Sequence, residues 1–525
     1  MIYLYPIILS LLPALHLFIN NRVPIKYAYP TWIAIAIFTG ILVFIIKSTI
    51  KSQEKAGIIA SFFSIGFFYF ELILRVLGSV SFTLGITQTR IDLHNGTIVP
   101  ILIFGIWLIL LINAVRLIIR SDSLVLKLNT FLIVVSLILI ISPLISVGKI
   151  IINIMNIEKT ITSSLPDNYL LDLPDQMDVL GNAEESRPDI YYLIFDAFAG
   201  QKILSVYYDT EISDFIDQLE KRGFYVAAES KPNYSQTICS LPSTLNISYL
   251  DDVSRLMNDR SSWNPLAAML QDNLVSNFLD KNGYELVTFS SGFWPTEDIR
   301  ADKKYSPFFN LNEYQEVLLV NTPVIRFYPN ILYDIHRERI NFTLSNLVNI
   351  ESEGKPKFVI SHIYCPHPPF VFDEKGNHIR PPRAFNKFDA DGYRLMGGTS
   401  AEYTEEYSDQ LNFLLDQIII IVDEILLEAK TPPILIIQGD HGPGSMITQH
   451  HLEETNLDER FSIMNAYYFP DQNYDTLYSE ITPVNTYRII LNQYFNTDLS
   501  LLPDKNYFST VFQPYEFVDM TEILD

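Results

Sequence analysis

The stretch "PILIIQGDHG", from Pro433 to Gly442, decides how the second half of the chain folds. Its apolar run is typical of a strand buried on both faces, as in a parallel sheet. The run ends in Asp440 and His441, two polar side chains that are costly at the rim of a core unless they have partners. The stretch therefore indicates either a polar turn or a metal site whose other ligands come from elsewhere in the chain.

Four further apolar runs, rich in β-branched and aromatic residues, resemble this one. With it, they cover residues 189–198, 223–230, 284–291, 357–365 and 433–440. Helical patterns lie between them, notably over residues 203–223 and 407–429. Alternating strands and helices predict an α/β domain with a mostly parallel central sheet and helices on both faces. In such sheets functional groups gather at the carboxyl ends of the strands.

The first 150 residues have a different pattern. Five long apolar runs cover residues 3–19, 29–46, 57–74, 98–119 and 128–147. Each has about the length that an α-helix needs to cross a ~30 Å hydrocarbon core. The first run has neither a basic n-region nor a small-residue cleavage site, so we expect a span and not a signal peptide. The sequence thus predicts a five-helix transmembrane domain at 1–148, a juxtamembrane linker at 149–187 and a catalytic domain at 188–525.

Charge divides the chain at the same place. Residues 1–150 hold 11 of the 37 basic and 4 of the 60 acidic residues, which leaves 26 basic and 56 acidic residues for 151–525. An acidic C-terminal part argues against nucleic acid as a partner. The second and fourth connections between the apolar runs are the more basic ones, with Lys47, Lys51, Lys55 and Arg116, Arg120, Lys127. The positive-inside rule then predicts a multi-pass membrane protein whose C-terminal domain is extracytoplasmic.

Polar residues follow several of the predicted strands. Asp196 ends the first strand, Thr237 lies in a hydroxyl-rich loop after the second, and His367 follows the run at 357–365. With Asp440 and His441, two carboxylates and an imidazole suit one divalent metal ion: manganese or magnesium for the oxygen ligands, or zinc because of the histidine. Metal coordination would lower the pKa of the Thr237 hydroxyl and make it a nucleophile. Taken singly, Asp196 could be a helix N-cap, Thr237 an ordinary loop hydroxyl and His367 part of a proline turn.

The layout resembles the alkaline phosphatase/sulfatase superfamily, especially its membrane-anchored branch of lipoteichoic acid synthases and lipid A phosphoethanolamine transferases. The segments that carry the resemblance are "YLIFDAF", "QTICSLPS", "HPPF" and "GDHG". The resemblance implies five membrane helices followed by a sulfatase-like catalytic domain. It also implies Asp196, Asp440 and His441 as metal ligands and Thr237 as both nucleophile and ligand. His367 would face the substrate phosphate.

The sequence departs from two branches of this superfamily. Sulfatases need Cys or Ser in the pattern C/S-x-P-x-R, but Cys239 is followed by Leu241 and Ser243 at the Pro and Arg positions. Sulfate-ester hydrolysis through a formylglycine is therefore disfavoured. Two-metal phosphatases need additional ligands, for which His450 and His451 are candidates, although a solvated pair of loop histidines is the simpler interpretation. We expect one metal ion.

The two cysteines lie near proposed site residues. Cys239 is two residues after Thr237, and Cys365 is two residues before His367. If the resemblance is right, these loops meet at the site, and a disulfide between them could form in an oxidising compartment. Two buried free thiols are the alternative.

Together these patterns predict a metal-dependent phospho-group transferase that acts on a phosphodiester through a phosphothreonine at Thr237. A membrane lipid would be the donor, and an envelope glycan or lipid would be the acceptor. The same residues could instead catalyse hydrolysis, as in a phosphatase or phosphodiesterase, or the domain could be a non-catalytic extracellular module. The helices themselves could transport lipid, but their most notable acid, Glu71, lies four residues before Arg75 and predicts an interfacial ion pair.

Overall fold

The chain forms two compact units. The computed structural model describes residues 4–21, 23–78, 98–164, 187–257, 261–351, 354–389, 391–448 and 451–524. One unit, here the helical unit, consists of Met1–Asn156 and Leu311–Leu332. The other consists of Ile157–Asn310 and Tyr333–Asp525 and is called the catalytic unit after the function that the sequence predicts for it. Residues 311–332, expected in the catalytic domain, thus group with the N-terminal helices, and the chain passes between the units three times.

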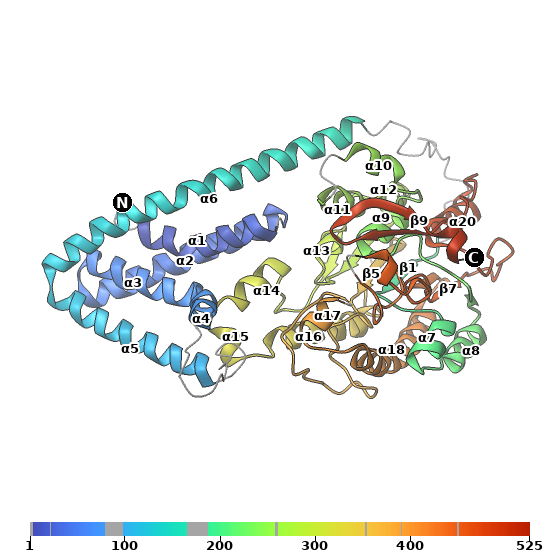
Figure 1. The fold of residues 1–525 in the computed structure, drawn as a ribbon. Helices are drawn as coiled ribbons and strands as arrows, with labels where there is room; N and C mark the ends of the chain where they lie inside the picture. The colour runs from blue at the N-terminus through green and yellow to red at the C-terminus, as the bar shows by residue number, and fades with distance from the viewer. Residues whose placement is uncertain are drawn as a thin grey trace. The chain divides into compact units, whose positions relative to one another are not determined.

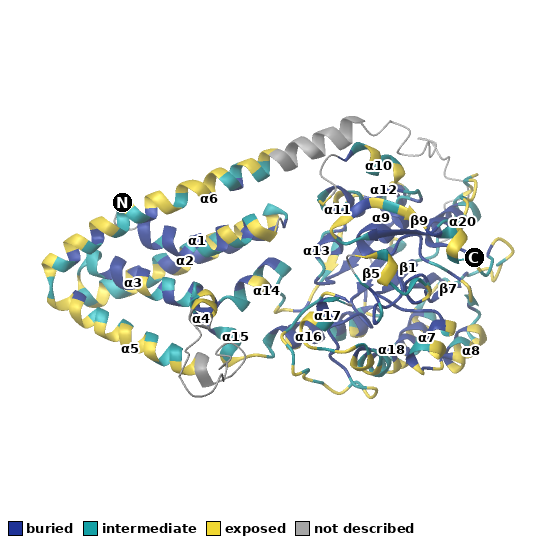
Figure 2. Ribbon diagram, viewed as in Figure 1, coloured by how far each residue is buried: buried dark blue, intermediate teal, exposed yellow. Residues whose placement is uncertain are grey.

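Long apolar helices make up most of the helical unit (Figure 1). They are α1 (Leu4–Asn21), α2 (Ile25–Ile50), α3 (Gln53–Phe68), α4 (Phe70–Gly78), α5 (Ile98–Arg120) and α6 (Asp122–Ser164). Among the described residues, α1, α2, α5 and α6 are long and apolar enough to cross a membrane, and α3 with α4 forms a fifth candidate span bent by 63°. Figure 2 shows many exposed residues along α5 and α6, and apolar side chains such as Leu110, Leu126 and Ile138 are among them. The predicted membrane helices are confirmed, and α6 continues as a helix into the expected linker.

The two basic connections of the helical unit lie at the same end of its helices. Lys55, at the start of α3, forms an ion pair of 2.9 Å with Asp122 at the start of α6. Its ammonium also donates to the carbonyl oxygen of Ile119 at 2.9 Å. The α2–α3 and α5–α6 connections therefore contact each other, as the positive-inside assignment of both to one side of the membrane requires.

Residues 311–332 add two short helices to the helical unit, α14 (Glu313–Val320) and α15 (Val324–Phe327). Tyr314 of α14 is buried; its hydroxyl accepts a hydrogen bond from the indole of Trp32 at 2.8 Å and donates to the carbonyl oxygen of Ala14 at 2.6 Å. Asn312 forms a capping box with Gln315 at the start of α14. These contacts join the segment to α1 and α2.

The prediction that Glu71 pairs with Arg75 is wrong. Glu71 is buried and pairs with Arg326 of α15 at 2.6 Å, while Arg75 is exposed. The reason is the break at Tyr69, because Glu71 falls in the first turn of the short helix α4 and not in the middle of a continuous span. A carboxylate is also favourable in the first turn of a helix.

A twisted sheet forms the centre of the catalytic unit. Within the described residues it has seven strands in the order β2-β7-β6-β1-β5-β3-β4. Their bounds are β1 Ile190–Phe195, β2 Tyr225–Val226, β3 Glu285–Phe289, β4 Lys303–Tyr305, β5 Lys357–Ile363, β6 Ile434–Gln438 and β7 Asn465–Tyr468. The pairs that β1 makes with β5 and β6, and β3 with β4 and β5, are parallel, while β7 is antiparallel to β6 and β2. The mostly parallel sheet confirms the predicted α/β class, although β4 and β7 were not predicted and β2 is shorter than expected.

Helices cover both faces of this sheet, as alternation along β1 requires (Figures 1 and 2). Tyr191, Leu193 and Phe195 belong to one core, while Ile190, Tyr192 and Ile194 belong to the other. The first core is closed by α7 (Gln201–Tyr208), α8 (Ser213–Lys221), α16 (Ile331–Asn346) and α18 (Ser400–Glu428). The second is closed by α9 (Thr237–Leu245), α11 (Asn264–Gln271), α12 (Leu274–Lys281) and α20 (Pro483–Phe495).

The expected helix over 203–223 is two helices. Asp209 adopts a positive φ of 48°, which ends α7 in the left-handed conformation common at helix C-termini. The expected helix over 407–429 begins earlier, at Ser400, because Thr399 and Glu402 form a capping box.

Shorter elements complete the catalytic unit. They are α10 (Asp251–Leu256), α13 (Trp294–Glu297), α17 (Asp391–Leu395), η2 (Leu452–Glu454), α19 (Leu457–Arg460), α21 (Thr521–Leu524) and the hairpin of β8 (Tyr507–Thr510) and β9 (Gln513–Asp519). The hairpin lies beside the loop before α9. The amide of Ser235 donates to the carbonyl oxygen of Tyr507 at 3.1 Å, and the Gln236 side chain donates to that of Ser509 at 3.0 Å.

Candidate active site

Asp196 lies directly after β1, between the ends of β5 and β6. Its amide donates to the carbonyl oxygen of Ile363 at the end of β5 at 3.0 Å. The next residue, Ala197, has a positive φ of 65°, and its amide donates to the Asp440 carboxylate at 3.1 Å. This sharp turn at the strand end brings the two acidic residues together, which are 244 positions apart in the sequence.

The loop after β6 approaches other backbone segments too closely for larger residues. A Cβ atom at Gly442 would lie 2.0 Å from the carbonyl oxygen of Glu459, and one at Gly439 would lie 2.3 Å from that of Phe198. Glycine is required on both sides of Asp440 and His441 for this reason. The "GDHG" motif is therefore a loop that packs closely against the backbone at Phe198 and Glu459, with the side chains of Asp440 and His441 directed into the site.

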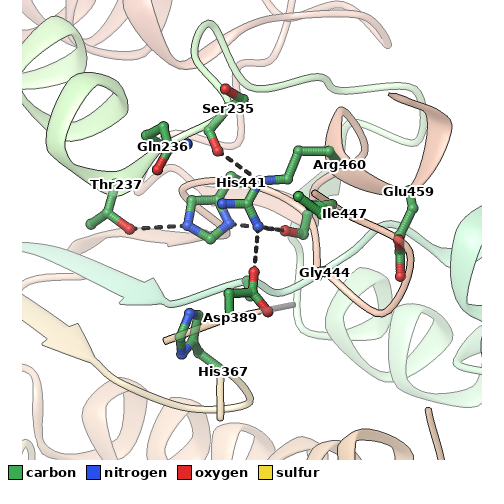
Figure 3. Close-up of polar contacts among 12 residues, drawn as sticks. Ser235, Gln236, Thr237, His367, Asp389, His441, Gly444, Ile447, Glu459 and Arg460 are labelled. Carbon is green, nitrogen blue, oxygen red and sulfur yellow. Dashed lines mark hydrogen bonds and ion pairs between the residues drawn. The ribbon is translucent and has the colours of Figure 1, made fainter. Parts of the chain in front are cut away.

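Thr237 is the first residue of α9, and its hydroxyl oxygen lies 3.0 Å from Nε2 of His441 (Figure 3). The other ring nitrogen, Nδ1, lies 2.9 Å from the carbonyl oxygen of Gly442, which can only accept a hydrogen bond. Nδ1 therefore carries the ring proton, and Nε2 presents a lone pair toward Thr237. A hydroxyl at a helix N-terminus also faces the positive end of the helix dipole, which favours developing negative charge.

His441 also lies close to both carboxylates. Its Nε2 is 3.4 Å from Oδ2 of Asp440 and 3.6 Å from Oδ1 of Asp196. The structure thus brings together the four residues that the sequence suggested as metal ligands: Asp196, Thr237, Asp440 and His441.

A fifth polar side chain, His362, was not predicted. It lies on β5, and its Nε2 is 3.2 Å from Oδ2 of Asp196. Asp196, His362 and Asp440 each offer a ligand atom within 4.8 Å of the other two, and all three side chains are buried. A histidine inside an apolar run that is buried on both faces was the available signal in the sequence.

The donor set fits a divalent cation. No described residue donates a conventional hydrogen bond to either carboxylate oxygen of Asp196, to Oδ2 of Asp440 or to Nε2 of His362. Buried carboxylates without donors are costly unless a cation compensates them. Carboxylate and imidazole ligands suit manganese, magnesium or zinc, and the coordinating atoms do not distinguish among these metals.

The electrostatics of the site keep its ligands in their metal-binding forms. Burial raises the pKa of Asp196, but the nearby His367 most strongly opposes this effect, and the pKa lies well below its usual value. Burial and then Arg460 lower the pKa of His441, against the attraction of the two carboxylates. At neutral pH, Asp196 is therefore an anion and His441 a neutral ring.

His367 lies in the loop after β5, near His441 (Figure 3). It is buried; its Nδ1 lies 2.5 Å from the carbonyl oxygen of Pro368, and the His367 and His441 ring centres are 6.3 Å apart. The Tyr364 ring, 4.5 Å away centre to centre, holds the imidazole from another side. His367 is close enough to act on a group bound at the carboxylates.

Arg460 joins the loop of Thr237 to the loop of His441 (Figure 3). Its guanidinium donates to the carbonyl oxygen of Ser235 at 2.6 Å and to that of Gly442 at 2.9 Å. It also pairs with Asp389 at 2.7 Å, and both side chains are only 3% exposed. Arg460 therefore fixes the nucleophile candidate relative to the metal-ligand candidates, and no sequence motif indicated this role.

The proposed disulfide between Cys239 and Cys365 is wrong, because both thiols are free and buried. Cys239 donates to the carbonyl oxygen of Pro514 at 3.4 Å, while Cys365 belongs to the hydrophobic core on the side of α18. Cys239 lies in α9 and Cys365 in the loop after β5, and the two side chains have different surroundings. Burial raises the pKa of Cys239 to about 12, so it is a thiol and not a thiolate at neutral pH.

His450 and His451 were the candidate ligands for a second metal ion. His451 is exposed, as expected for a solvated loop residue, while His450 lies outside the described residues.

Comparisons with known proteins concern the fold. No family model and no curated protein matches the sequence. A matching solved structure is the C-terminal periplasmic domain of EcEptC from Escherichia coli in complex with Zn, with 13% identity, a TM-score of 0.39 and coverage of 64% of this chain and 93% of that domain. Another is the integral membrane protein lipooligosaccharide phosphoethanolamine transferase A from Neisseria meningitidis, with 12% identity, a TM-score of 0.37 and coverage of 94% and 95%.

A putative sulfatase from Bacteroides thetaiotaomicron also matches, with 15% identity, a TM-score of 0.38 and coverage of 62% of this chain and 74% of the sulfatase. Structural neighbours thus include members of the superfamily that the motifs resemble. At these identities and TM-scores, the chemistry of this chain has to be inferred from its own side chains.

Proposed function

We propose that this chain is a membrane-anchored, metal-dependent transferase that moves a phospho-group from a phosphodiester, here a lipid head group, to an acceptor hydroxyl. Thr237 is the nucleophile and carries the group as a phosphothreonine. Asp196, Asp440, His441 and Thr237 hold one divalent cation, with His362 as a further ligand. His367 binds the phosphate.

The distance of 3.0 Å between the Thr237 hydroxyl and Nε2 of His441, inside a buried cluster of carboxylates, carries this proposal. Thr237 lies at a helix N-terminus, and Nε2 of its neighbour His441 lies 3.4 and 3.6 Å from two carboxylates. Both oxygens of Asp196 and Oδ2 of Asp440 have no hydrogen-bond donor among the described residues. Hydroxyls in such an arrangement are suited to nucleophilic catalysis.

In the first half of the reaction, the Thr237 oxygen bonds to phosphorus while the bond from phosphorus to the lipid alcohol breaks. The Thr237 proton passes to solvent, and the departing alcohol takes a proton from water. In the second half, an acceptor hydroxyl gives its proton to solvent, its oxygen bonds to phosphorus, and the bond to Thr237 breaks. Thr237 then regains its proton.

The surrounding residues bind and orient the phosphate. A divalent cation bound at the carboxylates lowers the pKa of the Thr237 hydroxyl and offsets charge on the phosphate oxygens. Nδ1 of His367 donates to Pro368, so its Nε2 is the nitrogen available to a phosphate oxygen. Arg460 keeps Thr237 in position through the carbonyl oxygen of Ser235.

Membrane helices give such an enzyme access to an insoluble donor. The basic connections joined by Lys55 and Asp122 place that end of the helices in the cytoplasm. An odd number of spans, five with α3 and α4 taken as one, then places the catalytic unit outside, where envelope glycans and lipids are the available acceptors. The acidic C-terminal part makes nucleic acid an unsuitable partner.

Intact-mass analysis after incubation with phospholipid vesicles and Mn²⁺ or Zn²⁺ tests the nucleophile. Wild type and Thr237→Ser are expected to gain the mass of one phospho-group, whereas Thr237→Val, which keeps the shape but lacks the hydroxyl, gains none. An identical adduct in Thr237→Val overturns the assignment.

Hydrolysis by the same residues remains the second candidate, because water and an acceptor hydroxyl attack phosphorus alike. Product analysis separates them: a phosphorylated glycan or lipid indicates transfer, whereas release of the free phospho-group indicates hydrolysis. Purified wild type that binds no divalent metal would instead favour a non-catalytic module.

A further inference from the structure

We infer that Thr296 is a positioning residue that fixes the tautomer and orientation of His362, and thereby the affinity of the site for its cation. This inference rests on the proposed function for the role of His362. Thr296 lies on α13, 66 positions before His362, and nothing in its sequence context suggests a functional role.

The contact is direct and buried. The Thr296 hydroxyl oxygen lies 2.9 Å from Nδ1 of His362. Thr296 is 2% exposed and His362 is 3% exposed, so water does not compete for this bond. The far side of the ring, Nε2, faces Oδ2 of Asp196 at 3.2 Å.

The other partners of Thr296 favour one direction for this bond. Its hydroxyl lies 3.2 Å from the carbonyl oxygen of Phe293, which can only accept, and 2.8 Å from the hydroxyl oxygen of Ser291. The single Thr296 proton therefore has two acceptor oxygens besides the ring. A lone pair of Thr296 is left to accept from the ring, which places the ring proton on Nδ1.

This tautomer leaves a bare lone pair on Nε2, directed at Asp196. A lone pair and a carboxylate oxygen 3.2 Å apart repel each other unless a cation lies between them. The Thr296 contact thus supplies the ring in the form that a metal ligand must have. The opposite tautomer would donate to Asp196 and remove both atoms from the cation.

Thr296 is itself held in place independently of His362. Glu297 accepts hydrogen bonds from the amides of Ser291 and Gly292 at 3.0 and 2.9 Å and from the Ser290 hydroxyl at 2.8 Å. It also pairs with Lys304 at 3.0 Å. The turn that carries Thr296 is therefore fixed by its own contacts, and Thr296 orients His362 and not the reverse.

Two matched variants test the inference. Thr296→Ser keeps the hydroxyl, whereas Thr296→Val keeps the branched shape without it. Mn²⁺ and Zn²⁺ affinities are measured on the full chain in detergent by competition with a chelator, with kcat and KM for phospholipid and thermal unfolding alongside. Loss of the hydrogen-bond partner of a metal-binding histidine typically weakens metal binding or activity by about 10–100-fold. We expect this loss in Thr296→Val, with Thr296→Ser within about threefold of wild type.

Several outcomes contradict the inference. Equal metal affinity in Thr296→Val and wild type overturns it, as does an equal loss in both variants, which would show only a packing defect. Wild type that binds neither cation also overturns it. Because Thr296→Val could fail to fold, ¹⁵N NMR of histidine-labelled wild type, assigned by His362→Gln, provides a second measurement. A protonated Nδ1 supports the inference, and a protonated Nε2 overturns it.

Failure of the proposed function gives a different result. If wild type transfers no phospho-group but its metal affinity still depends on the Thr296 hydroxyl, the positioning role stands and the proposed reaction is wrong. If transfer occurs and metal affinity is independent of this hydroxyl, the reaction stands and the positioning role is wrong.

Discussion

Two arginine–carboxylate ion pairs, one in each unit, have similar geometry but join different parts of the chain. Arg460 and Asp389 of the catalytic unit lie 2.7 Å apart, and Arg326 and Glu71 of the helical unit lie 2.6 Å apart. Each pair joins segments distant in sequence, by 71 and 255 positions. Arg460 also donates to two backbone carbonyl oxygens, those of Ser235 and Gly442, in the segments that hold Thr237 and His441.

The difference shows that the short distance of an arginine–carboxylate pair alone does not indicate a functional role. Arg326 is 24% exposed and connects α15 to α4, so its loss concerns how residues 311–332 are held. Arg460 is 3% exposed and determines the spacing between Thr237 and His441. The segments that each arginine joins distinguish the two cases: Arg460 joins those of Thr237 and His441, and Arg326 joins α15 to α4.

Removing Arg460 should have the largest effect. Arg460→Met removes the guanidinium that pairs with the buried Asp389 carboxylate, and breaking a buried pair in this way typically costs about 3–5 kcal/mol of unfolding free energy. Transfer should also be lost, because the loops of Thr237 and His441 lose their common donor. Urea unfolding and phospholipid assays measure the two effects.

A second variant separates stability from geometry. In Arg460→Met with Asp389→Leu, the buried carboxylate is removed together with its arginine, so much of the stability should return while transfer stays low. Recovery of activity together with stability would show that Arg460 acts only through its ion pair.

Removing Arg326 should be the milder change. Arg326→Met removes the guanidinium that pairs with Glu71, but Arg326 is partly exposed, so we expect a cost of about 1–3 kcal/mol in the helical unit. Metal affinity should be unchanged, because Asp196 and Asp440 belong to the other unit. Chelator competition and thermal unfolding in the same detergent check this, and a weakened metal site would remove the contrast between the pairs.

Acidification should reduce the contribution of the Arg460–Asp389 pair to the free energy of unfolding. Burial raises the pKa of Asp389, but His367 and then Arg460 and His441 outweigh it and hold the pKa below its ordinary value. The stability from this carboxylate is therefore fully present above the unfolded-state pKa, near 3.9, and is lost as the pH falls through the lower folded-state pKa.

The measurement compares unfolding free energies of wild type and Asp389→Asn. Their difference should stay constant from pH 8 to about pH 5 and shrink below that, with a slope of at most about 1.4 kcal/mol per pH unit. A difference that grows on acidification would mean that folding raises the pKa of Asp389 and does not lower it.

The exposed pair of Arg222 and Asp423 provides the smallest expected effect. It has the bidentate geometry of a strong pair, at 2.6 and 2.7 Å, but Asp423 is 53% exposed. Surface pairs contribute about 0–1 kcal/mol, so Arg222→Gln should change urea unfolding little. A loss as large as that in Arg460→Met would mean that bidentate geometry, and not burial, sets the cost.

The sequence predicted those site residues that follow strands. Asp196, Asp440 and His441 come directly after apolar runs, and parallel strands bring their carboxyl ends to one edge, so their proximity followed from the fold class. His362 differs because it lies within β5, where strand pairing places it opposite Ile194. Its polar ring in a fully buried strand was a usable signal, but alternation alone did not mark it.

Residues that support the site could not be predicted in this way. Thr296 and Arg460 act through contacts with His362 and Gly442 that exist only after distant segments pack together. The same limit applies in the helical unit, where local spacing favoured Arg75 as the partner of Glu71. The bend between α3 and α4 instead turns Glu71 toward Arg326.

The return of residues 311–332 to the helical unit affects how the protein could be shed or truncated. A single proteolytic cut between residues 157 and 187 would leave the catalytic unit attached, because the chain re-enters the helical unit at Leu311 and leaves it after Leu332. A fragment that begins at residue 188 would carry Tyr314 and Leu318, buried here beside membrane helices, into water. Such a fragment would be prone to aggregate unless residues 311–332 were replaced by a short polar loop.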